Sequence, residues 1–164
     1  CTATLTGHAG PVLSVAIAPD GSWLAIVSAY GAVRLWDRAT GTSTTTFTGH
    51  TDRLKAVAIA PDGTWLATAE DNAGTVRLWD RATGACTATL TGHTDRVEAV
   101  AIAPDGTWLA TASSDRTVRI WNAAGGGLAA MVGAEGELYS CAWGAARELA
   151  VGGERGLYLF KLLT

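Results

Sequence analysis

Three histidines are the residues of this chain best suited to chemistry. His8, His50 and His93 each follow a glycine. An imidazole beside a hydroxyl and a carboxylate can act as the base of a hydrolase triad, and clustered imidazoles can bind zinc. The histidines are 42 and 43 residues apart, however, with no second metal ligand at short spacing and no Gly-x-Ser-x-Gly turn that would present a nucleophile. We therefore expect no catalytic residue, no metal and no cofactor.

Each histidine begins a sequence motif that occurs three times along the chain. Each copy contains a Pro-Asp-Gly turn and closes on a tryptophan followed by Asp or Asn, at Trp36, Trp79 and Trp121. A fixed period within ~20–50 residues indicates a repeat architecture. Residues 1–164 are therefore predicted to be one repeat segment, with repeats at approximately 1–41, 42–84, 85–124 and 125–164.

The last repeat is degenerate. Ala134 stands where the histidine is expected, Phe160 replaces the tryptophan, and the Pro-Asp-Gly turn is lost.

Each repeat is expected to form four short antiparallel strands. In the third copy, residues 97–103, 107–113 and 117–122 alternate apolar and polar side chains or are rich in β-branched residues, with turn residues between them. A lone four-stranded sheet cannot bury both of its faces, whereas sheets stacked side by side and curved into a ring can. The fold class predicted is all-β, with about four blades in the chain.

The ordered elements Gly-His, Pro-Asp-Gly and LATASSDRTVRIW resemble the WD-repeat family of β-propellers. The repeats resemble those found C-terminally in large bacterial signalling proteins. The resemblance implies a non-catalytic scaffold or sensor module that binds protein partners.

The resemblance also implies a buried hydrogen-bonded tetrad of His, Ser or Thr, Asp and Trp in each blade. The third repeat offers a complete set, the second has an acid position that could be Asp71 or Asn72, and the first has Ile26 and Tyr30 at the hydroxyl and acid positions. The fourth retains Glu154 as a possible acid. The residues assigned to the tetrads are His93, Thr111, Asp115, Trp121, His50, Thr68, Asn72, Trp79, His8 and Trp36.

Partner binding is expected where the repeats differ while the residues around them stay constant. In the family such positions lie at the start of the first strand and in the turn after the second. The alternative is neutral drift of exposed residues. The predicted binding positions are Pro11, Leu13, Ala29, Arg53, Lys55, Asp71, Arg96, Glu98, Ser114, Glu137 and Tyr139, and Gly153 stands at the turn position of the last repeat.

Composition excludes several kinds of partner. Charged residues make up 16% of the chain and its net charge is −3, with no basic run, so we expect no nucleic-acid binding. No apolar run approaches the roughly 18 residues of a membrane helix. Cys1, Cys86 and Cys141 form no disulfide pattern, which favours a reduced, cytoplasmic protein.

The order of the strands leaves both ends of the chain unmatched. Residues 1–6 read as the fourth strand of a blade, and residues 156–161 as a third strand. The ends could pair within one chain, the chain could be part of a longer propeller, as the absence of an initiator Met suggests, or two chains could form an eight-bladed ring. For the isolated chain we expect a homodimer, joined through edge strands near Thr2–Leu5 and Leu157–Phe160.

Two other functions remain open at this point. The chain could be a structural propeller half that binds only its own copy, or it could hold an enzyme or small-ligand site at the channel mouth.

Overall fold

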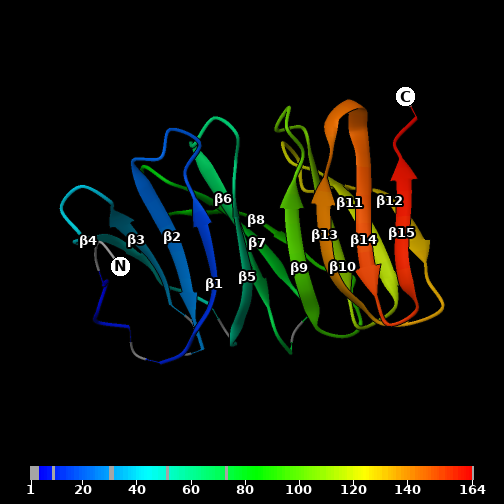
Figure 1. Cartoon of the computed structure of the whole chain (residues 1–164), viewed down its shortest axis with the longest axis horizontal. Coiled ribbons are helices and arrows are strands. Elements are labelled where there is room, and N and C mark those ends of the chain that lie inside the picture. The colour runs from blue at the N-terminus through cyan, green and yellow to red at the C-terminus, as the bar shows by residue number, and fades with distance from the viewer. Residues whose placement is uncertain (1–3, 9, 30–31, 51, 73, 164) are drawn as a thin grey trace.

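A computed structural model describes residues 4–8, 10–29, 32–50, 52–72 and 74–163. Within them the chain forms fifteen β-strands and one short 3-10 turn, arranged as four antiparallel sheets side by side (Figure 1). The prediction of an all-β protein built from about four propeller blades is confirmed. The described part of the chain contains no helix long and apolar enough to span a membrane.

Three blades have four strands each, in sequential order. Blade 1 consists of β1 (Val12–Ile17), β2 (Trp23–Ser28), β3 (Val33–Asp37) and β4 (Ser43–Phe47). Blade 2 consists of β5 (Leu54–Ile59), β6 (Trp65–Glu70), β7 (Val76–Asp80) and β8 (Cys86–Leu90). Blade 3 consists of β9 (Val97–Ile102), β10 (Trp108–Ser113), β11 (Thr117–Asn122) and β12 (Leu128–Gly133).

Blade 4 has three strands, β13 (Leu138–Trp143), β14 (Glu148–Gly153) and β15 (Gly156–Lys161). In this sheet, as described, β15 is an edge strand, whereas the corresponding strand of blade 3, β11, is covered by β12. A 3-10 turn at Ala145–Arg147 joins β13 to β14, a single helical turn that the strand pattern did not predict.

The first two strands of blades 1 to 3 are joined by the Pro-Asp-Gly turn. In blade 3, Gly106 has a φ of +72° and donates its N–H to the Ala103 carbonyl at 2.8 Å. The Asp105 carboxylate accepts the backbone N–H of Thr107 at 2.9 Å. Glycine adopts positive φ without the steric cost that a Cβ would add, so this tripeptide closes the turn in all three copies.

Blades 2 and 3 each pack on their two neighbours through the two opposite faces of the sheet. We call the face that packs on the following blade the forward face, and the one that packs on the preceding blade the rear face. Between blades 1 and 2, the forward face supplies mostly small or β-branched side chains and the rear face supplies larger ones. The core residues of this contact include Ala25, Val27, Val33, Leu35 and Phe47 of blade 1, and Leu54, Val57, Leu66 and Trp79 of blade 2.

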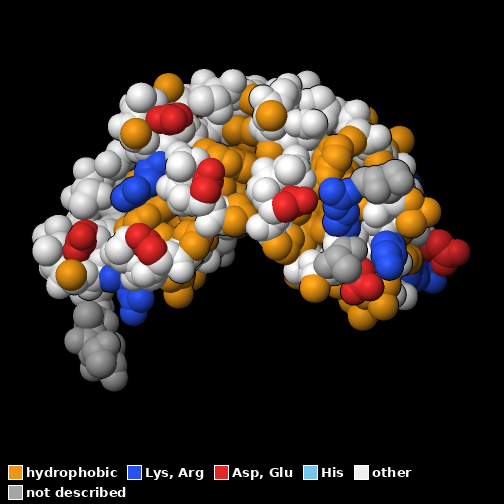
Figure 2. All heavy atoms as spheres, turned by 90° about the horizontal axis from the view of Figure 1, so that it is seen from above, with side chains coloured by type: hydrophobic (Ala, Val, Ile, Leu, Met, Phe, Trp, Pro, Cys, Tyr) orange, Lys and Arg blue, Asp and Glu red, His pale blue; other side chains and the backbone are white. Residues whose placement is uncertain are grey.

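The four blades form an open arch (Figure 2), with blade 1 at one end of it and blade 4 at the other (Figure 1). At one end the rear face of blade 1 is uncovered, and Val15 and Ile17 are 57% and 61% exposed. At the other end the forward face of blade 4 is uncovered, and Leu157 and Leu159 are 69% and 75% exposed.

The predicted N-terminal strand differs from the structure. Residues 1–3, including Thr2, lie outside the described part of the chain, and Thr4–Thr6 do not form a strand. The physical reason is that, among the described residues, no third strand of a preceding blade lies beside this segment, so its backbone has no ladder to join.

Candidate protein-binding face and buried histidine networks

The four tetrad residues of blade 3 are hydrogen-bonded in series. Trp121 donates its Nε1–H to the Thr111 hydroxyl at 2.9 Å, and that hydroxyl lies 2.7 Å from His93 Nε2. His93 Nδ1 lies 2.7 Å from a carboxylate oxygen of Asp115. A neutral imidazole with its proton on Nδ1 satisfies every member, because the Thr111 hydroxyl can then donate to Nε2.

Electrostatics in this network follows from burial and hydrogen bonding. Burial lowers the pKa of His93, which Asp115 opposes and Arg119 reinforces. Burial also acts to raise the pKa of Asp115, but hydrogen bonds from Thr117 and His93 and from the Thr94 backbone outweigh it and lower the pKa to about 2. The network therefore holds a neutral imidazole against an ionised carboxylate at neutral pH.

Blade 2 repeats part of this arrangement. Trp79 donates to the Thr68 hydroxyl at 2.9 Å, and His50 Nε2 lies 3.1 Å from the same hydroxyl. Asp71 corresponds to Ser114, because each directly follows the last residue of the second strand. Asn72 therefore corresponds to Asp115 and stands at the acid position. Its side-chain amide donates to Asp52 at 3.1 Å.

Blade 1 keeps the ring contact but loses the hydroxyl. His8 packs on Trp36 with ring centroids 5.2 Å apart. Ile26 occupies the position of Thr68 and Thr111, and the buried Trp36 Nε1–H has no hydrogen-bond partner among the described residues. Tyr30, at the acid position, lies outside the described residues.

The assignments in blade 4 are off by one residue. Gly153 pairs with Leu138 as Ser113 pairs with Val97, so it ends a strand and does not occupy the turn. Glu154 takes the turn position, donating its N–H to the Glu137 carbonyl at 2.8 Å, and it is exposed. Glu154 is therefore not a buried tetrad acid, because it corresponds to Ser114 and not to Asp115. Two glycines at 152 and 153 concealed the register in the sequence.

The first strand of every blade carries a β-bulge at the same place. The strand registers skip one residue in β1, β5, β9 and β13, leaving it without a ladder partner. A bulge redirects the side chain of the extra residue and bends the strand. The four skipped residues, called here the bulge row, are Leu13, Lys55, Glu98 and Tyr139.

The remaining predicted binding positions flank the bulge row. In each blade the turn after the second strand donates a backbone N–H to a carbonyl two residues before the bulge. These hydrogen bonds join Ala29 to Pro11 at 3.0 Å, Asp71 to Arg53 at 2.7 Å, and Ser114 to Arg96 at 2.9 Å. The structure thus brings together both sets of positions that the sequence singled out, with Glu154 and Glu137 completing the pattern in blade 4.

Polar contacts connect the bulge row across blades 2 and 3. Lys55 Nζ lies 3.0 Å from Glu98 Oε2, an ion pair between neighbouring blades. The Ser114 hydroxyl donates to the other Glu98 oxygen at 3.2 Å, and Arg96 Nε lies 3.8 Å from it. Glu98 is therefore the centre of a fixed polar cluster.

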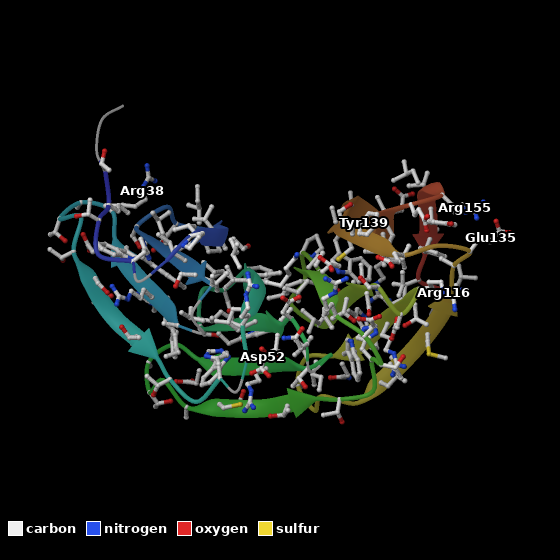
Figure 3. All side chains as sticks on the ribbon, turned by 90° about the horizontal axis from the view of Figure 1, so that it is seen from below. Arg38, Asp52, Arg116, Glu135, Tyr139 and Arg155 are labelled. Carbon is white, nitrogen blue, oxygen red and sulfur yellow. The ribbon has the colours of Figure 1, made fainter. Side chains whose placement is uncertain are left out.

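Tyr139 extends the row onto blade 4, on β13 at the inner side of the arch (Figure 3). It is 49% exposed. Desolvation and the negative charges of Glu137, Glu154 and Glu98 raise the pKa of its hydroxyl, which stays neutral at physiological pH.

Comparison with known proteins decides the family. The family model described as "WD domain, G-beta repeat" matches residues 1–37, 41–80 and 84–122, which is more than half of the chain. The chain belongs to the WD-repeat family. It is also similar to Protein Mut11 of Chlamydomonas reinhardtii, with 54% identity over 41 residues that cover 25% of this chain and 11% of that protein. The match therefore spans about one WD repeat and a small part of that relative's length.

The tetrad hydroxyls of blades 2 and 3 in these WD repeats are poorly placed to act as nucleophiles. Thr68 and Thr111 are fully buried, and each already accepts a tryptophan N–H. A nucleophile must reach its substrate, and these two cannot in this structure. Among the described residues, no group of three or more His, Cys, Asp or Glu side chains is placed to hold a metal ion.

One buried charge in the WD repeats escaped the sequence pattern. Glu70 is fully buried in blade 2, where the other blades have Ser28, Ser113 and Gly153. Its carboxylate lies 2.8 Å from the Nε of Arg77, which donates to it. The signal available beforehand was an acidic residue at a position occupied by serine in two other copies.

Proposed function

We propose that this WD-repeat chain is a non-catalytic protein-binding platform whose contact surface is the bulge row. One observation carries the proposal: the same backbone bulge, in four successive blades, presents four different side chains. The surrounding sequence barely changes, since residues 56–69 and 99–112 are identical. A constant frame with varied, redirected side chains is suited to recognition.

The chemistry of the row favours a polar protein segment as the partner. Leu13 offers an apolar contact, Lys55 and Glu98 offer both signs of charge, and Tyr139 offers an exposed aromatic ring. Tyrosine is enriched among residues that dominate binding energy, and mixed polar groups are typical of the rim around them. A phosphate backbone would instead favour a surface of a single positive sign.

A displayed library of random peptides provides the test. We expect the chain to select peptides whose affinity falls at least tenfold in the triple variant Lys55→Ala, Glu98→Ala, Tyr139→Ala. The matched control is Arg38→Ala, an exposed residue on the turn between β3 and β4, which should bind the same peptides as the native chain. If the triple variant binds them equally well, the bulge row is not the contact surface.

A second candidate is self-association as a structural propeller half, favoured by the apolar faces exposed at both ends of the arch. We further propose a cytoplasmic location and a role within signalling, on the basis of composition and of the likeness to signalling proteins. Cys86 and Cys141 are both unpaired among the described cysteines, in keeping with a reducing compartment.

A further inference from the structure

The two uncovered faces of the arch correspond to the two surfaces that meet where blade 1 packs on blade 2. The rear face of blade 1 presents residues that correspond, strand by strand, to the rear face that blade 2 packs on blade 1. By strand register, Val12, Val15, Ile17, Leu24 and Trp36 stand where blade 2 has Leu54, Val57, Ile59, Leu66 and Trp79.

The forward face of blade 4 matches the other surface. Its residues on β13 and β14 are small, and its residues on β15 are two leucines. By register, Ala142, Ala150, Gly152, Leu157 and Leu159 stand where blade 1 has Ala16, Ala25, Val27, Val33 and Leu35. The forward face of blade 4 is therefore suited to pack on the rear face of blade 1.

The N-terminal segment already lies where the outer strand of a preceding blade belongs. Leu5 approaches Gly41 of blade 1, its side chain 3.6 Å from the site of a Cβ there, as Phe47 of blade 1 approaches Gly84 of blade 2 at 3.7 Å. Arg34 donates to the Gly7 carbonyl, and the ring of His8 packs on Trp36. Blade 1 therefore holds this segment in place through its own contacts.

The segment would pair with a third strand that has one free edge, and among the described strands β15 has such an edge. Residues 1–8 have the same sequence as residues 86–93, which include β8, and β8 pairs with the third strand of blade 2. In that pairing Leu90 lies opposite Val76. The same register would place Leu5 opposite Leu157 of a second copy.

The outer side of β15 is also open to a strand. A cavity of about 590 Å³ lies beside it, lined by Phe160 and Leu162 of blade 4 and by Trp108, Ile120 and Val132 of blade 3. An unpaired strand beside an apolar groove is a template for an added strand.

We propose that a second copy of this chain docks its blade 4 onto blade 1 of the first, and that the reciprocal contact closes a ring of eight blades. Each copy supplies the fourth strand that the other copy's blade 4 lacks. The contact is head-to-tail and closes after two copies. Eight blades lie within the ~4–8 known for propellers. The inference deepens the self-association candidate and rests on it.

Solution mass is the first measurement. Light scattering on the purified chain at micromolar concentration should give twice the chain mass of 16.8 kDa. A strict monomer would overturn the proposal, and so would an open series of larger oligomers, because the ring must close at two.

A mixing experiment tests the head-to-tail geometry. Ile17→Glu places a charge on the rear face of blade 1, and Leu159→Glu places one on the forward face of blade 4. Each variant alone should be monomeric, because both contacts of its dimer contain one altered face. Mixed together, they should form a heterodimer, because one contact then joins two unaltered faces.

Controls keep the result interpretable. Both residues are more than half exposed, so we expect circular dichroism to show folded variants. Met131→Glu alters an exposed apolar residue of β12 outside both faces and should leave the dimer intact. Failure of the mixture to associate, or dimers that survive either single change, would overturn the proposal. The bulge-row triple variant should remain dimeric, so a failure of peptide binding and a failure of assembly are told apart.

Discussion

Lys55 and Glu98, the bulge residues of two neighbouring blades, form an ion pair of 3.0 Å across the inner end of the blade 2 and blade 3 contact. The pair ties together the side chains of two residues that have no partner in the strand registers. Glu98 is largely buried and also accepts from Ser114, whereas Lys55 is more exposed. Within the polar cluster, the Glu98 side chain is therefore fixed, whereas the Lys55 side chain is free to adjust to a partner.

A double-mutant cycle with Lys55→Met and Glu98→Gln measures this coupling. We expect a coupling energy of about 0.2–1 kcal/mol, falling with added salt, because Lys55 remains in contact with water. The measurement is urea unfolding of the four proteins. A coupling that salt leaves unchanged would show that the pair is shielded from solvent, contrary to its exposure here.

Replacing Thr111 by Val should destabilise blade 3 strongly. The change removes the shared partner of His93 and Trp121, and each loses a hydrogen bond while buried. We expect a loss of about 2–4 kcal/mol, measured by chemical denaturation.

The matched control is Ile26→Val, at the same position of blade 1. No hydrogen bond is lost there, because Trp36 Nε1 has no partner among the described residues. This change should cost only about 0.5–1.5 kcal/mol. Because valine keeps the volume of threonine, a loss below about 0.5 kcal/mol in Thr111→Val would mean that the hydrogen bonds of this hydroxyl contribute nothing.

Acid should destabilise the fold in two steps that come from the blade 3 network. The folded-state pKa of His93 lies below its ordinary value of 6.5, so the unfolded chain takes up this proton first. Stability is therefore full above about pH 6.5 and falls as the pH drops from there toward the lowered pKa.

The second step belongs to Asp115, whose pKa falls from 3.8 to about 2 on folding. It contributes about 2 kcal/mol above pH 4, which is lost between about pH 4 and pH 2. Thermal unfolding across pH should show the first step weakened in His93→Gln and the second weakened in Asp115→Asn. A native profile unchanged in both variants would place the acid sensitivity elsewhere, for example at His8, whose pKa burial also lowers.

The repeat period was enough to predict the blades, because turn residues and alternating strands recur at fixed positions. The same period identified Lys55, Glu98 and Tyr139 as variable. It could not show that they are bulged, since a bulge is a relation between two strands and depends on counting residues in both. The Gly153 position was wrong because the glycines at 152 and 153 carry no side chain that would mark the register, and the turn position belongs to Glu154.

The buried ion pair of blade 2 yields an asymmetric prediction. Arg77→Met leaves the fully buried carboxylate of Glu70 without its guanidinium, and we expect a loss of about 3–5 kcal/mol. Adding Glu70→Ser, the residue that two other blades carry at this position, removes the buried charge as well. The double variant should therefore recover most of the loss, because a buried pair often contributes little net stability compared with neutral groups. Denaturation of the single and double variants decides the matter: a double variant no more stable than Arg77→Met would show that the carboxylate, and not the pairing, is what blade 2 requires.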